Sequence, residues 1–270
     1  MKDYSHLPFG VRHLRAQWRV WRLSLKNARR AFRPGELFYQ LAIGQAGAFQ
    51  VAFRRGTSDE KVIAHSFDQD IFFSGTPEYR PQPHHTILDI GAHIGGFALV
   101  AARKVPAGRV YAVEACQETF DYLRVNVALN RLDNITAERL AIADQRGVVR
   151  LYHDDGNWGH SIMAPLSPVW EETPTLSLAE YLAERGVESV DFIKMNCEGA
   201  EFPILMAAPV TLLQRVGCML VLYHADLSPR HTLDELRAHL HAAGFVTRLR
   251  HQDGDRGWLV ALRENGPSDH

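Results

Sequence analysis

At the ends of two predicted apolar strands, the sequence places side chains that can hold or move a proton. Residues 192–205, FIKMNCEGAEFPIL, begin as a buried strand and continue as a helix, with Asn196 at the end of the strand. Glu198 and Glu201 stand at the start of that helix, where the helix dipole favours negative charge. His224 ends a second apolar strand, and an imidazole titrates near neutral pH. These residue types indicate acid–base chemistry at one edge of a sheet.

Each of these residues also has an alternative role. Glu198 either contacts a substrate or caps the helix, whereas a structural role is favoured for Glu201. His224, with Tyr223 beside it at the substrate edge, is either the general base or a hydrogen-bonding loop residue. Asn196 is not a base, but its amide can orient a ligand and so take part in catalysis.

A polar loop, HDDGNWGHSIM at residues 153–163, supplies two further candidates. Loops of this kind commonly carry substrate contacts. Trp158 either covers a substrate or a cationic ligand, through a cation–π contact of about 0.5–2 kcal/mol, or packs within the loop. His160 is a candidate for both substrate binding and proton transfer.

A separate stretch, residues 86–105, TILDIGAHIGGFALVAARKV, predicts a strand, a glycine turn and a helix. The strand carries Asp89, which can orient an ammonium group, and glycines 91 and 95 let the backbone approach a ligand at the helix N-terminus. The G-x-x-x-G spacing differs from the G-x-G-x-x-G turn that binds a diphosphate, which favours a ligand without phosphates. Glu114 ends the next strand, where an acid can hydrogen-bond two ribose hydroxyls. The pattern predicts a nucleoside site.

The elements that position these residues alternate between strands and helices. This alternation predicts a parallel sheet covered by helices on both faces, with the ligand at the carboxyl ends of the strands. The tail segments FVTRLRH and RGWLVALRE flank QDGD, which predicts an antiparallel hairpin around Gly254. The expected parallel strands are 86–90, 109–113, 134–142, 189–195 and 217–223.

The part of the chain before this alternation forms an accessory region. We divide the chain into residues 1–80, the accessory region, and residues 81–270, the ligand-binding domain. Residues 47–73 show β-type alternation interrupted by a glycine, which predicts a hairpin or short sheet with Ser58 or Asp59 as a turn or cap residue.

The N-terminus is strongly basic. Residues 1–33 carry nine Lys/Arg and one acid, a charge of +8, so the remainder carries −9. Apolar residues at alternating three- and four-residue spacing predict an amphipathic helix that ends near Pro34. Three roles stay open for it: packing on the main domain or on a second subunit of a homodimer, covering the substrate site, or binding an anionic membrane surface or nucleic acid.

Composition narrows the class of protein. The 270 residues, 46% hydrophobic and 23% charged, suit one α/β domain with an accessory segment. No apolar run approaches the roughly 18–20 residues of a transmembrane helix, and the N-terminus lacks a signal-peptide pattern. Three cysteines without metal-type spacing favour a cytoplasmic setting. The acidic remainder lacks a basic face interleaved with aromatic residues, so no nucleic-acid partner is expected.

Several motifs in one order resemble a known family. DIGAHIG and VYAVEACQETFDYLRVNVALN resemble the motifs of class I S-adenosylmethionine-dependent methyltransferases. More narrowly, these motifs with RRGTSDEKVIAHSF and VDFIKMNCEGAEFPIL resemble the FkbM family over roughly residues 50–225. The resemblance implies a Rossmann-like class I methyltransferase fold, a seven-stranded sheet with an antiparallel last strand, preceded here by the N-terminal helix and the small β lead-in.

The resemblance also assigns residues to the cofactor, S-adenosylmethionine. The glycine turn cradles its methionine end, the acid holds its ribose, and two short segments enclose its adenine. The helix residues Asn126 and Asn130 match recurrent family positions, for which capping and interhelical hydrogen bonds are favoured. The implied cofactor residues are Asp89, Gly91, His93, Gly95, Glu114, Ala115, Cys116, Ala141, Asp144 and Asn196.

Three positions depart from the family pattern. His93 stands where asparagine is usual, Asn196 where the K-x-D-x-E-G block has aspartate, and Ser177 where T-L-D supplies an acid. Because positions 196 and 177 lack the family's carboxylates, we expect neither a metal site nor base catalysis at these two positions. The expected function is metal-independent O-methylation of a hydroxyl on a small natural product or sugar. N- or carboxyl-methylation of a small molecule, favoured by Asn196, and a non-catalytic S-adenosylmethionine-binding scaffold are the alternatives.

Overall fold

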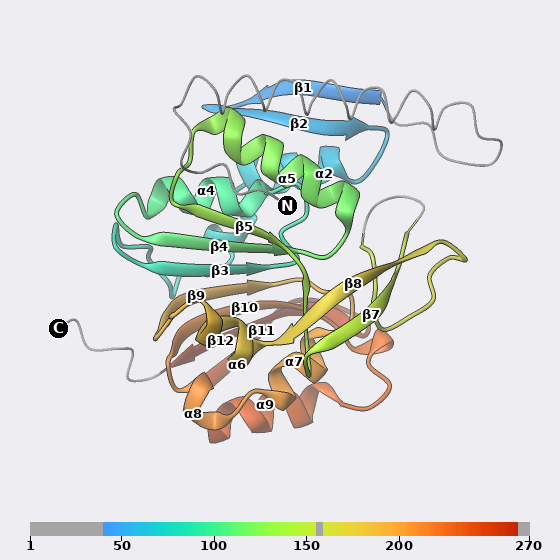
Figure 1. Ribbon diagram of the computed structural model, residues 1–270. Helices are drawn as coiled ribbons and strands as arrows, with labels where there is room; N and C mark the ends of the chain where they lie inside the picture. Colours follow the sequence, from blue (N-terminus) through green and yellow to red (C-terminus); the bar gives the residue numbers. More distant parts are fainter. Residues whose placement is uncertain (1–39, 155–158, 264–270) are drawn as a thin grey trace.

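The computed structural model describes residues 40–154 and 159–263 (Figure 1). The basic amphipathic helix expected within residues 1–33 lies outside the described residues, as does Trp158. A homodimer through that helix therefore stays a prediction. Within the two described ranges, no helix combines the length and hydropathy that a bilayer-spanning segment requires.

A seven-stranded sheet runs through the centre of the described residues, in the order β11-β12-β10-β9-β3-β4-β5 (Figure 1). Strands β10, β9, β3, β4 and β5 run parallel to one another, whereas β12 is antiparallel to both of its neighbours, β10 and β11. The predicted parallel sheet with a terminal hairpin is confirmed. The strands are β3 (Thr86–Ile90), β4 (Arg109–Glu114), β5 (Ile135–Arg139), β9 (Val190–Met195), β10 (Val216–His224), β11 (Phe245–Asp253) and β12 (Arg256–Arg263).

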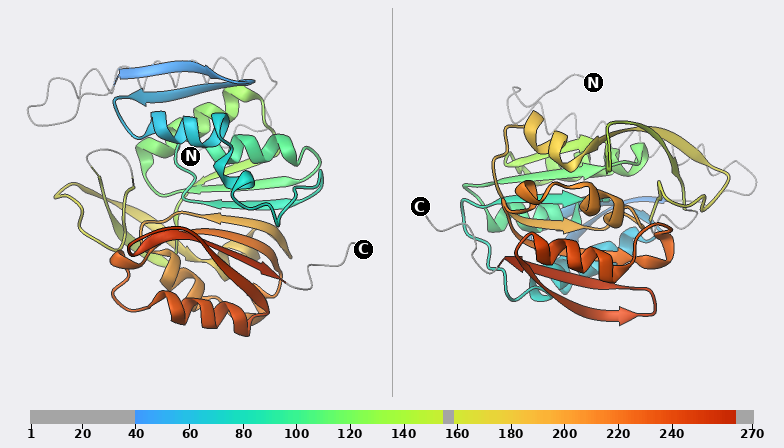
Figure 2. Two further views of the ribbon diagram at one scale, coloured as in Figure 1. Left: turned by 180° about the vertical axis from the view of Figure 1, so that it is seen from behind. Right: turned by 90° about the horizontal axis from the view of Figure 1, so that it is seen from below.

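Helices cover both faces of this sheet (Figures 1 and 2). Successive side chains of a strand point to opposite faces, so Ile87 and Leu88 of β3 enter different apolar cores. A strand buried on both faces needs an almost continuous apolar sequence, so the position of β3 could be predicted from the sequence. One face carries α4 (Gly96–Lys104) and α5 (Gln117–Asn130), and the other carries α6 (Leu178–Glu184), α7 (Glu201–Ala207), α8 (Val210–Leu213) and α9 (Leu233–Ala242).

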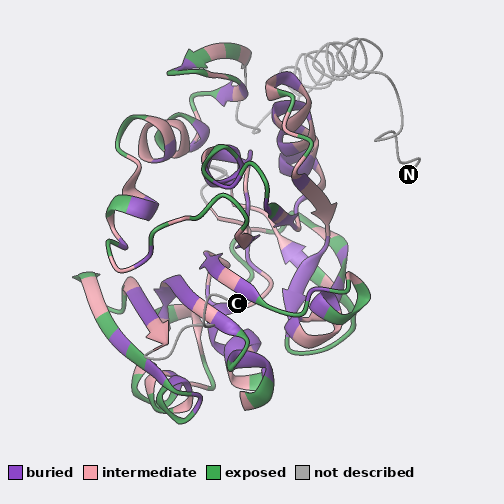
Figure 3. Cartoon of the chain, turned by 90° about the vertical axis from the view of Figure 1, so that its left-hand side faces the viewer, coloured by how far each residue is buried: buried purple, intermediate pink, exposed green. Residues whose placement is uncertain are grey.

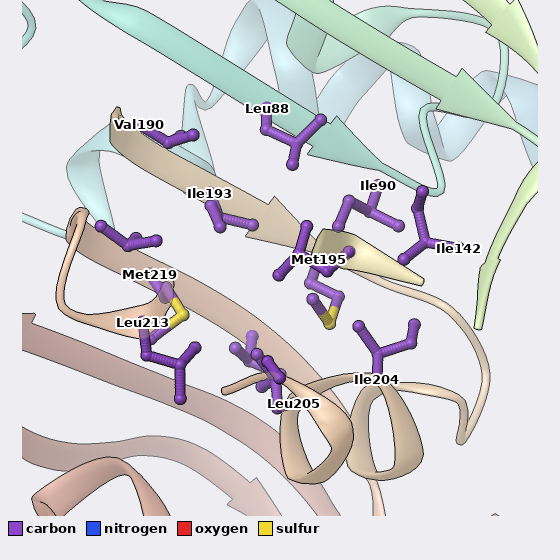
Figure 4. Packing of buried hydrophobic residues seen from close by; sticks show 14 of the residues in the cluster. Leu88, Ile90, Ile142, Val190, Ile193, Met195, Ile204, Leu205, Leu213 and Met219 are labelled. Atoms are coloured by element: carbon purple, nitrogen blue, oxygen red, sulfur yellow. The ribbon is translucent and has the colours of Figure 1, made fainter. Parts of the chain in front are cut away.

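The core beneath the sheet holds the strand ends in place. Ile193 and Met195 of β9 pack close to Ile204 and Leu205 of α7 (Figure 4). All four side chains are buried, and burial of such a side chain contributes about 1.5–3 kcal/mol. Buried residues, purple in Figure 3, recur along the central strands. The end of β9 is therefore a rigid platform for the polar residues that follow it.

The lead-in differs from its prediction. A hairpin is present, but it is formed by β1 (Gln40–Ala46) and β2 (Phe49–Arg55), and the chain then becomes helical. Ser58 is the N-cap residue, and two acids in the first turn complement the helix dipole, so the β-type alternation over 59–73 is overridden. The helical elements are α2 (Asp59–Ile63), the π-helix η1 (Ala64–Asp68) and α3 (Ile71–Ser74).

Two asparagines fasten the hairpin to α5. Asn126 Oδ1 accepts from the backbone N–H of Ala52 at 2.7 Å, and its Nδ2 donates to the carbonyl oxygen of Ile94 at 2.8 Å. Asn130 exchanges two hydrogen bonds with the backbone of Gln50. A structural role is confirmed for both asparagines, but their hydrogen bonds reach the hairpin and the turn after β3 and are not the expected capping and interhelical bonds.

A second, three-stranded sheet stands at the carboxyl ends of the central strands (Figures 1 and 2). The segment expected as one strand over 134–142 is divided at Leu140 between β5 and β6. Ser177 forms a capping box with Glu180 at the start of α6. Its position is thus a helix cap, which serine supplies as well as aspartate does. The strands of the sheet are β6 (Ala141–Ala143), β7 (Gly147–Tyr152) and β8 (Trp170–Ser177).

Candidate active site

A cavity of about 900 Å³, open solvent at its mouth included, lies where β3, β4 and β9 end. Residues of β6, of the loop before Ile162 and of the helical lead-in complete its walls. Eight sequence-predicted residues line it: Gly91, His93, Glu114, Ala115, Ala141, His160, Asn196 and Glu198. Six others do not: Asp89, Gly95, Cys116, Asp144, Tyr223 and His224.

The glycine turn brings two strands into close approach. Gly91 has φ +76°, and a Cβ placed on it would lie 1.9 Å from the carbonyl oxygen of Asn196. The backbone N–H of Asn196 donates to the carbonyl oxygen of Ile90 at 3.0 Å, so the end of β9 is tied to the end of β3. A side chain at position 91 would separate these strand ends.

We expect Gly91→Ala to destabilise the protein more than Gly186→Ala. Both glycines have positive φ, which costs an alanine roughly 1–3 kcal/mol, but the space around Gly186 is open. Overlap with the carbonyl oxygen of Asn196 should add about 1–3 kcal/mol at position 91. Urea unfolding of both variants measures the difference. Equal losses would show that the close approach is not a constraint.

Asp89 is engaged by a buried lysine that sequence reasoning missed. Lys194 Nζ lies 3.0 Å from Asp89 Oδ1 and donates to the carbonyl oxygen of Gly91 at 2.7 Å. Burial raises the pKa of Asp89, and the charge of Lys194 partly offsets that effect. Lys194 lines the cavity, whereas Asp89 is fully buried behind it. A lysine within an apolar strand was the available signal, because a buried charge requires a partner.

Glu114 organises the turn with both carboxylate oxygens. Oε2 accepts from the backbone N–H of His93 at 2.8 Å, and Oε1 accepts from that of Cys116 at 2.9 Å. Burial raises the pKa of Glu114, and these hydrogen bonds oppose that rise. Because a carboxylate has about four lone-pair sites, Glu114 retains acceptor capacity for ribose hydroxyls.

His93 connects the turn to the lead-in. Its φ is +54°, a conformation in which Asn and His are enriched, so histidine can replace the usual asparagine here. His93 Nε2 lies 3.7 Å from Asp59 Oδ1, and Asp59 forms a fully buried pair with Arg54 at 2.8 Å. Arg54 also lies over the ring of Tyr122, 5.0 Å from its centroid. The lead-in thus contacts the cofactor turn through the polar side chains of Asp59 and His93.

His160 lies beside Cys116 and His153, and possible metal-ligating atoms of the three residues lie within 4.8 Å of one another. The backbone N–H of Asp154 donates to His160 Nδ1 at 3.0 Å, so the neutral ring carries its proton on Nε2 and has no lone pair left for a metal. Burial lowers the pKa of His160 to about 3. At neutral pH His160 is an uncharged hydrogen-bond donor and a weak base.

Glu198, His224 and Glu201 form a linked acid–base group. His224 Nδ1 lies 3.3 Å from Glu201 Oε1, and its Nε2 lies 3.5 Å from Glu198 Oε2. Burial lowers the pKa of His224, but hydrogen bonding and charge from Glu201 and Glu198 outweigh burial, and the net pKa is raised. Burial likewise raises the pKa of Glu198, which His224 partly offsets. Of the three, Glu198 lines the cavity.

The two glutamates are held in different ways. Glu201 accepts from the backbone N–H groups of Cys197 at 2.5 Å and Gly199 at 2.8 Å, which fits the structural role expected for it. Glu198 has φ +50°, and a Cβ at Gly159 would lie 2.2 Å from its side chain. Only a glycine at position 159 leaves Glu198 its place at the cavity.

The reversed strand β12, the glycine turn after β3 and the acid that ends β4 define a class I methyltransferase. Comparison with known families agrees, because the methyltransferase FkbM domain matches residues 89–247. The chain belongs to the FkbM methyltransferase family, and its methyl donor is S-adenosylmethionine.

Individual relatives are distant. The chain is 26% identical to 31-O-demethyl-FK506 methyltransferase FkbM of Streptomyces tacrolimicus, over 59% of this chain and 68% of that protein. It is 28% identical to methyltransferase sdnD of Sordaria araneosa, over 44% of this chain and 58% of that protein. Among solved structures, Aeropyrum pernix fibrillarin with bound S-adenosyl-L-methionine aligns with a TM-score of 0.47 at 17% identity, covering 85% of each chain.

The described residues fit this cofactor. The buried amide oxygen of Asn196 has no hydrogen-bond partner in the part of the chain that the structure describes, as expected of a group that meets a ligand. Glu114 offers acceptor oxygens, and Ile90, Ile142 and Ala115 offer apolar surface for a purine ring. The cavity therefore provides a polar end and an apolar wall for a nucleoside.

Proposed function

We propose that this protein transfers the methyl group of S-adenosylmethionine to a hydroxyl of a small natural product or sugar without using a metal ion. The observation that carries this proposal is the carboxyl group of Glu198 at the cavity, backed by His224. A hydroxyl loses its proton when it is methylated, so its acceptor site needs a base. Burial raises the pKa of Glu198, which makes its carboxylate a stronger base than an exposed one.

Each polar residue has one role in this proposal. Glu198 accepts the proton of the acceptor hydroxyl, and Asn196 Oδ1, an acceptor without a partner among the described residues, receives a hydrogen bond from the amino group of the cofactor. His224 is a positioning residue rather than the base, because it lies behind Glu198 and its two nitrogens face carboxylates. Its positive charge stabilises ionised Glu198, and Glu201 fixes the orientation of its ring.

The remaining residues hold the cofactor and shape the site. When bound, S-adenosylmethionine supplies a methyl group already activated by a sulfonium, so the protein needs to align the acceptor, exclude water and remove one proton. Glu114 holds the ribose, while Ala115 and Ala141 flank the adenine. His160 contributes a hydrogen bond from Nε2, which has no hydrogen-bond partner among the described residues. A binding role suits it better than proton transfer because its pKa is about 3.

A labelled-methyl transfer assay tests the proposal. We expect transfer to a panel of small hydroxylated compounds, with the labelled atom located on oxygen. The Streptomyces tacrolimicus relative, named 31-O-demethyl-FK506 methyltransferase, supports an oxygen acceptor. The partnerless oxygen of Asn196 favours an amine as second candidate, because it could accept an amine N–H. Label on nitrogen or carboxylate would select those alternatives, and cofactor binding without any transfer would favour a scaffold.

The ribose assignment predicts that Glu114→Gln weakens cofactor binding. The variant retains its size but loses the charge that strengthens hydrogen bonds from hydroxyls, which are worth about 1.5–3 kcal/mol to a charged group. We expect the affinity for S-adenosylhomocysteine to fall roughly 10–100-fold, measured by isothermal titration calorimetry. Unchanged affinity in a folded variant would show that Glu114 only supports the turn.

A further inference from the structure

A second unsatisfied polar group faces the cofactor cavity from outside the matched family domain. Ser66 is 1% exposed and lines the cavity, and its Oγ has no hydrogen-bond partner among residues 40–154 and 159–263. The family match begins at Asp89, so it assigns no role to the lead-in. A buried hydroxyl without a partner is costly unless a ligand supplies one.

The neighbours of Ser66 indicate which part of a ligand it meets. A Cβ on Gly96, the first residue of α4, would lie 2.4 Å from Ser66 Oγ. The nine residues of α4 begin without a side-chain cap, and helix N-terminal amides attract anions. Lys194 lines the same cavity, with its ammonium group paired to Asp89. An anionic group is the ligand chemistry that suits this end.

The local fold holds Ser66 in this position. Ser66 belongs to the π-helix η1, and such wide turns are rare and frequently occur at functional sites. The preceding helix α2 begins at Asp59, whose carboxylate is fixed by Arg54 and faces His93 of the glycine turn. The lead-in therefore cannot move without disturbing the turn.

From these observations we infer that Ser66 binds the carboxylate of the cofactor's methionine moiety, with Oγ–H as the donor. The lead-in is then part of the cofactor site rather than an appendage to it. The inference rests on the cofactor assignment, and it identifies a specificity-determining contact for the amino-acid end of the nucleoside.

Two nucleosides that differ at that end test the inference. S-adenosylhomocysteine has the amino-acid group, and 5′-methylthioadenosine lacks it. We expect Ser66→Ala to lower the affinity for S-adenosylhomocysteine by roughly 10-fold or more, the effect of losing a hydrogen bond to a charged group, with the affinity for 5′-methylthioadenosine unchanged within twofold. Calorimetry measures both. Equal losses for the two ligands, or no loss for either, would overturn the inference.

A matched variant controls for packing. Thr76 is also fully buried, and its hydroxyl has no hydrogen-bond partner within the described ranges of the chain. It does not line the cavity, so Thr76→Val should leave both affinities unchanged. Without ligand, neither variant should unfold more easily than the wild type, because each loses an unsatisfied hydroxyl. A wild-type protein that binds neither nucleoside would overturn the cofactor assignment and this inference together, whereas normal binding by Ser66→Ala would overturn this inference alone.

Discussion

Glu198→Gln should reduce the turnover number by about 10²–10⁴-fold, the usual contribution of a positioned general base. Glutamine retains the size of the side chain beside Gly159 but cannot take up the acceptor's proton at neutral pH. Because the proposed role of Glu198 is toward the acceptor, the affinity for S-adenosylhomocysteine should stay within about twofold of the wild type. Single-turnover transfer of labelled methyl, with calorimetry alongside, measures both quantities. More than a tenth of wild-type turnover in this variant would place the base elsewhere.

The pH dependence of kcat/KM gives a second check on this residue. Activity should rise as Glu198 loses its proton, at a pH above the ordinary pKa of 4.5, because burial raises its pKa. It should fall as His224 loses its proton, above the ordinary pKa of 6.5, because the two glutamates raise the pKa of His224. In His224→Gln the alkaline limb should vanish, and the acid limb should move to higher pH because a stabilising positive charge is lost. A profile identical to that of the wild type would exclude the linked group.

Asp59→Asn should lower the free energy of unfolding by about 3–5 kcal/mol, because it leaves a buried guanidinium without its countercharge. Both side chains of the Arg54–Asp59 pair are fully buried, and Arg54 donates to both carboxylate oxygens. Urea unfolding measures the loss. The exposed Asp234, which lies 3.8 Å from Arg237, provides the control, since Asp234→Asn should change stability by less than about 0.5 kcal/mol.

The same pair should make the stability of the protein depend on pH in the acid range. Burial alone would raise the pKa of Asp59, but the charge and hydrogen bonds of Arg54 outweigh burial and lower it. A lowered folded-state pKa stabilises the protein fully above the unfolded value of 3.8, and this stability is lost as the pH falls through the folded-state value. The wild type should therefore lose more stability between pH 5 and 2 than Asp59→Asn does. Parallel losses would show that Asp59 is already protonated.

The strands that could be predicted from the sequence are those buried on both faces. The segment 86–90 coincides with β3, because a continuous apolar run between glycine and proline signals permits little else. The segment over 59–73 was predicted wrongly because it is helical and partly π-helical, and its inward-facing residues do not follow one period. The strands β7 and β8 also escaped prediction, since the exposed Val148 and Trp170 blur the alternation that marks a half-buried strand.

The residue types of the site could be predicted, but their pairings could not. Strands β9 and β10 were both expected, and their pairing, which was not predicted, brings Glu198 near His224. His224 lies behind Glu198 because the backbone at Glu198 is left-handed. No sequence pattern predicts that conformation for a glutamate. Lys194 was overlooked because its carboxylate partner, Asp89 of β3, lies 105 residues earlier in the chain (194 − 89). Sequence spacing does not show that two residues so far apart form a pair.

The antiparallel strand β12 has a consequence for synthesis of the protein on the ribosome. It follows β10 and β11 in sequence, yet it lies between them and pairs with both. While residues 256–263 are still in the exit tunnel, the long edge of β10 has no hydrogen-bonding neighbour on that side, and a nascent chain in this state is open to association with other chains. A polypeptide stalled before residue 256 should therefore depend on a chaperone for solubility.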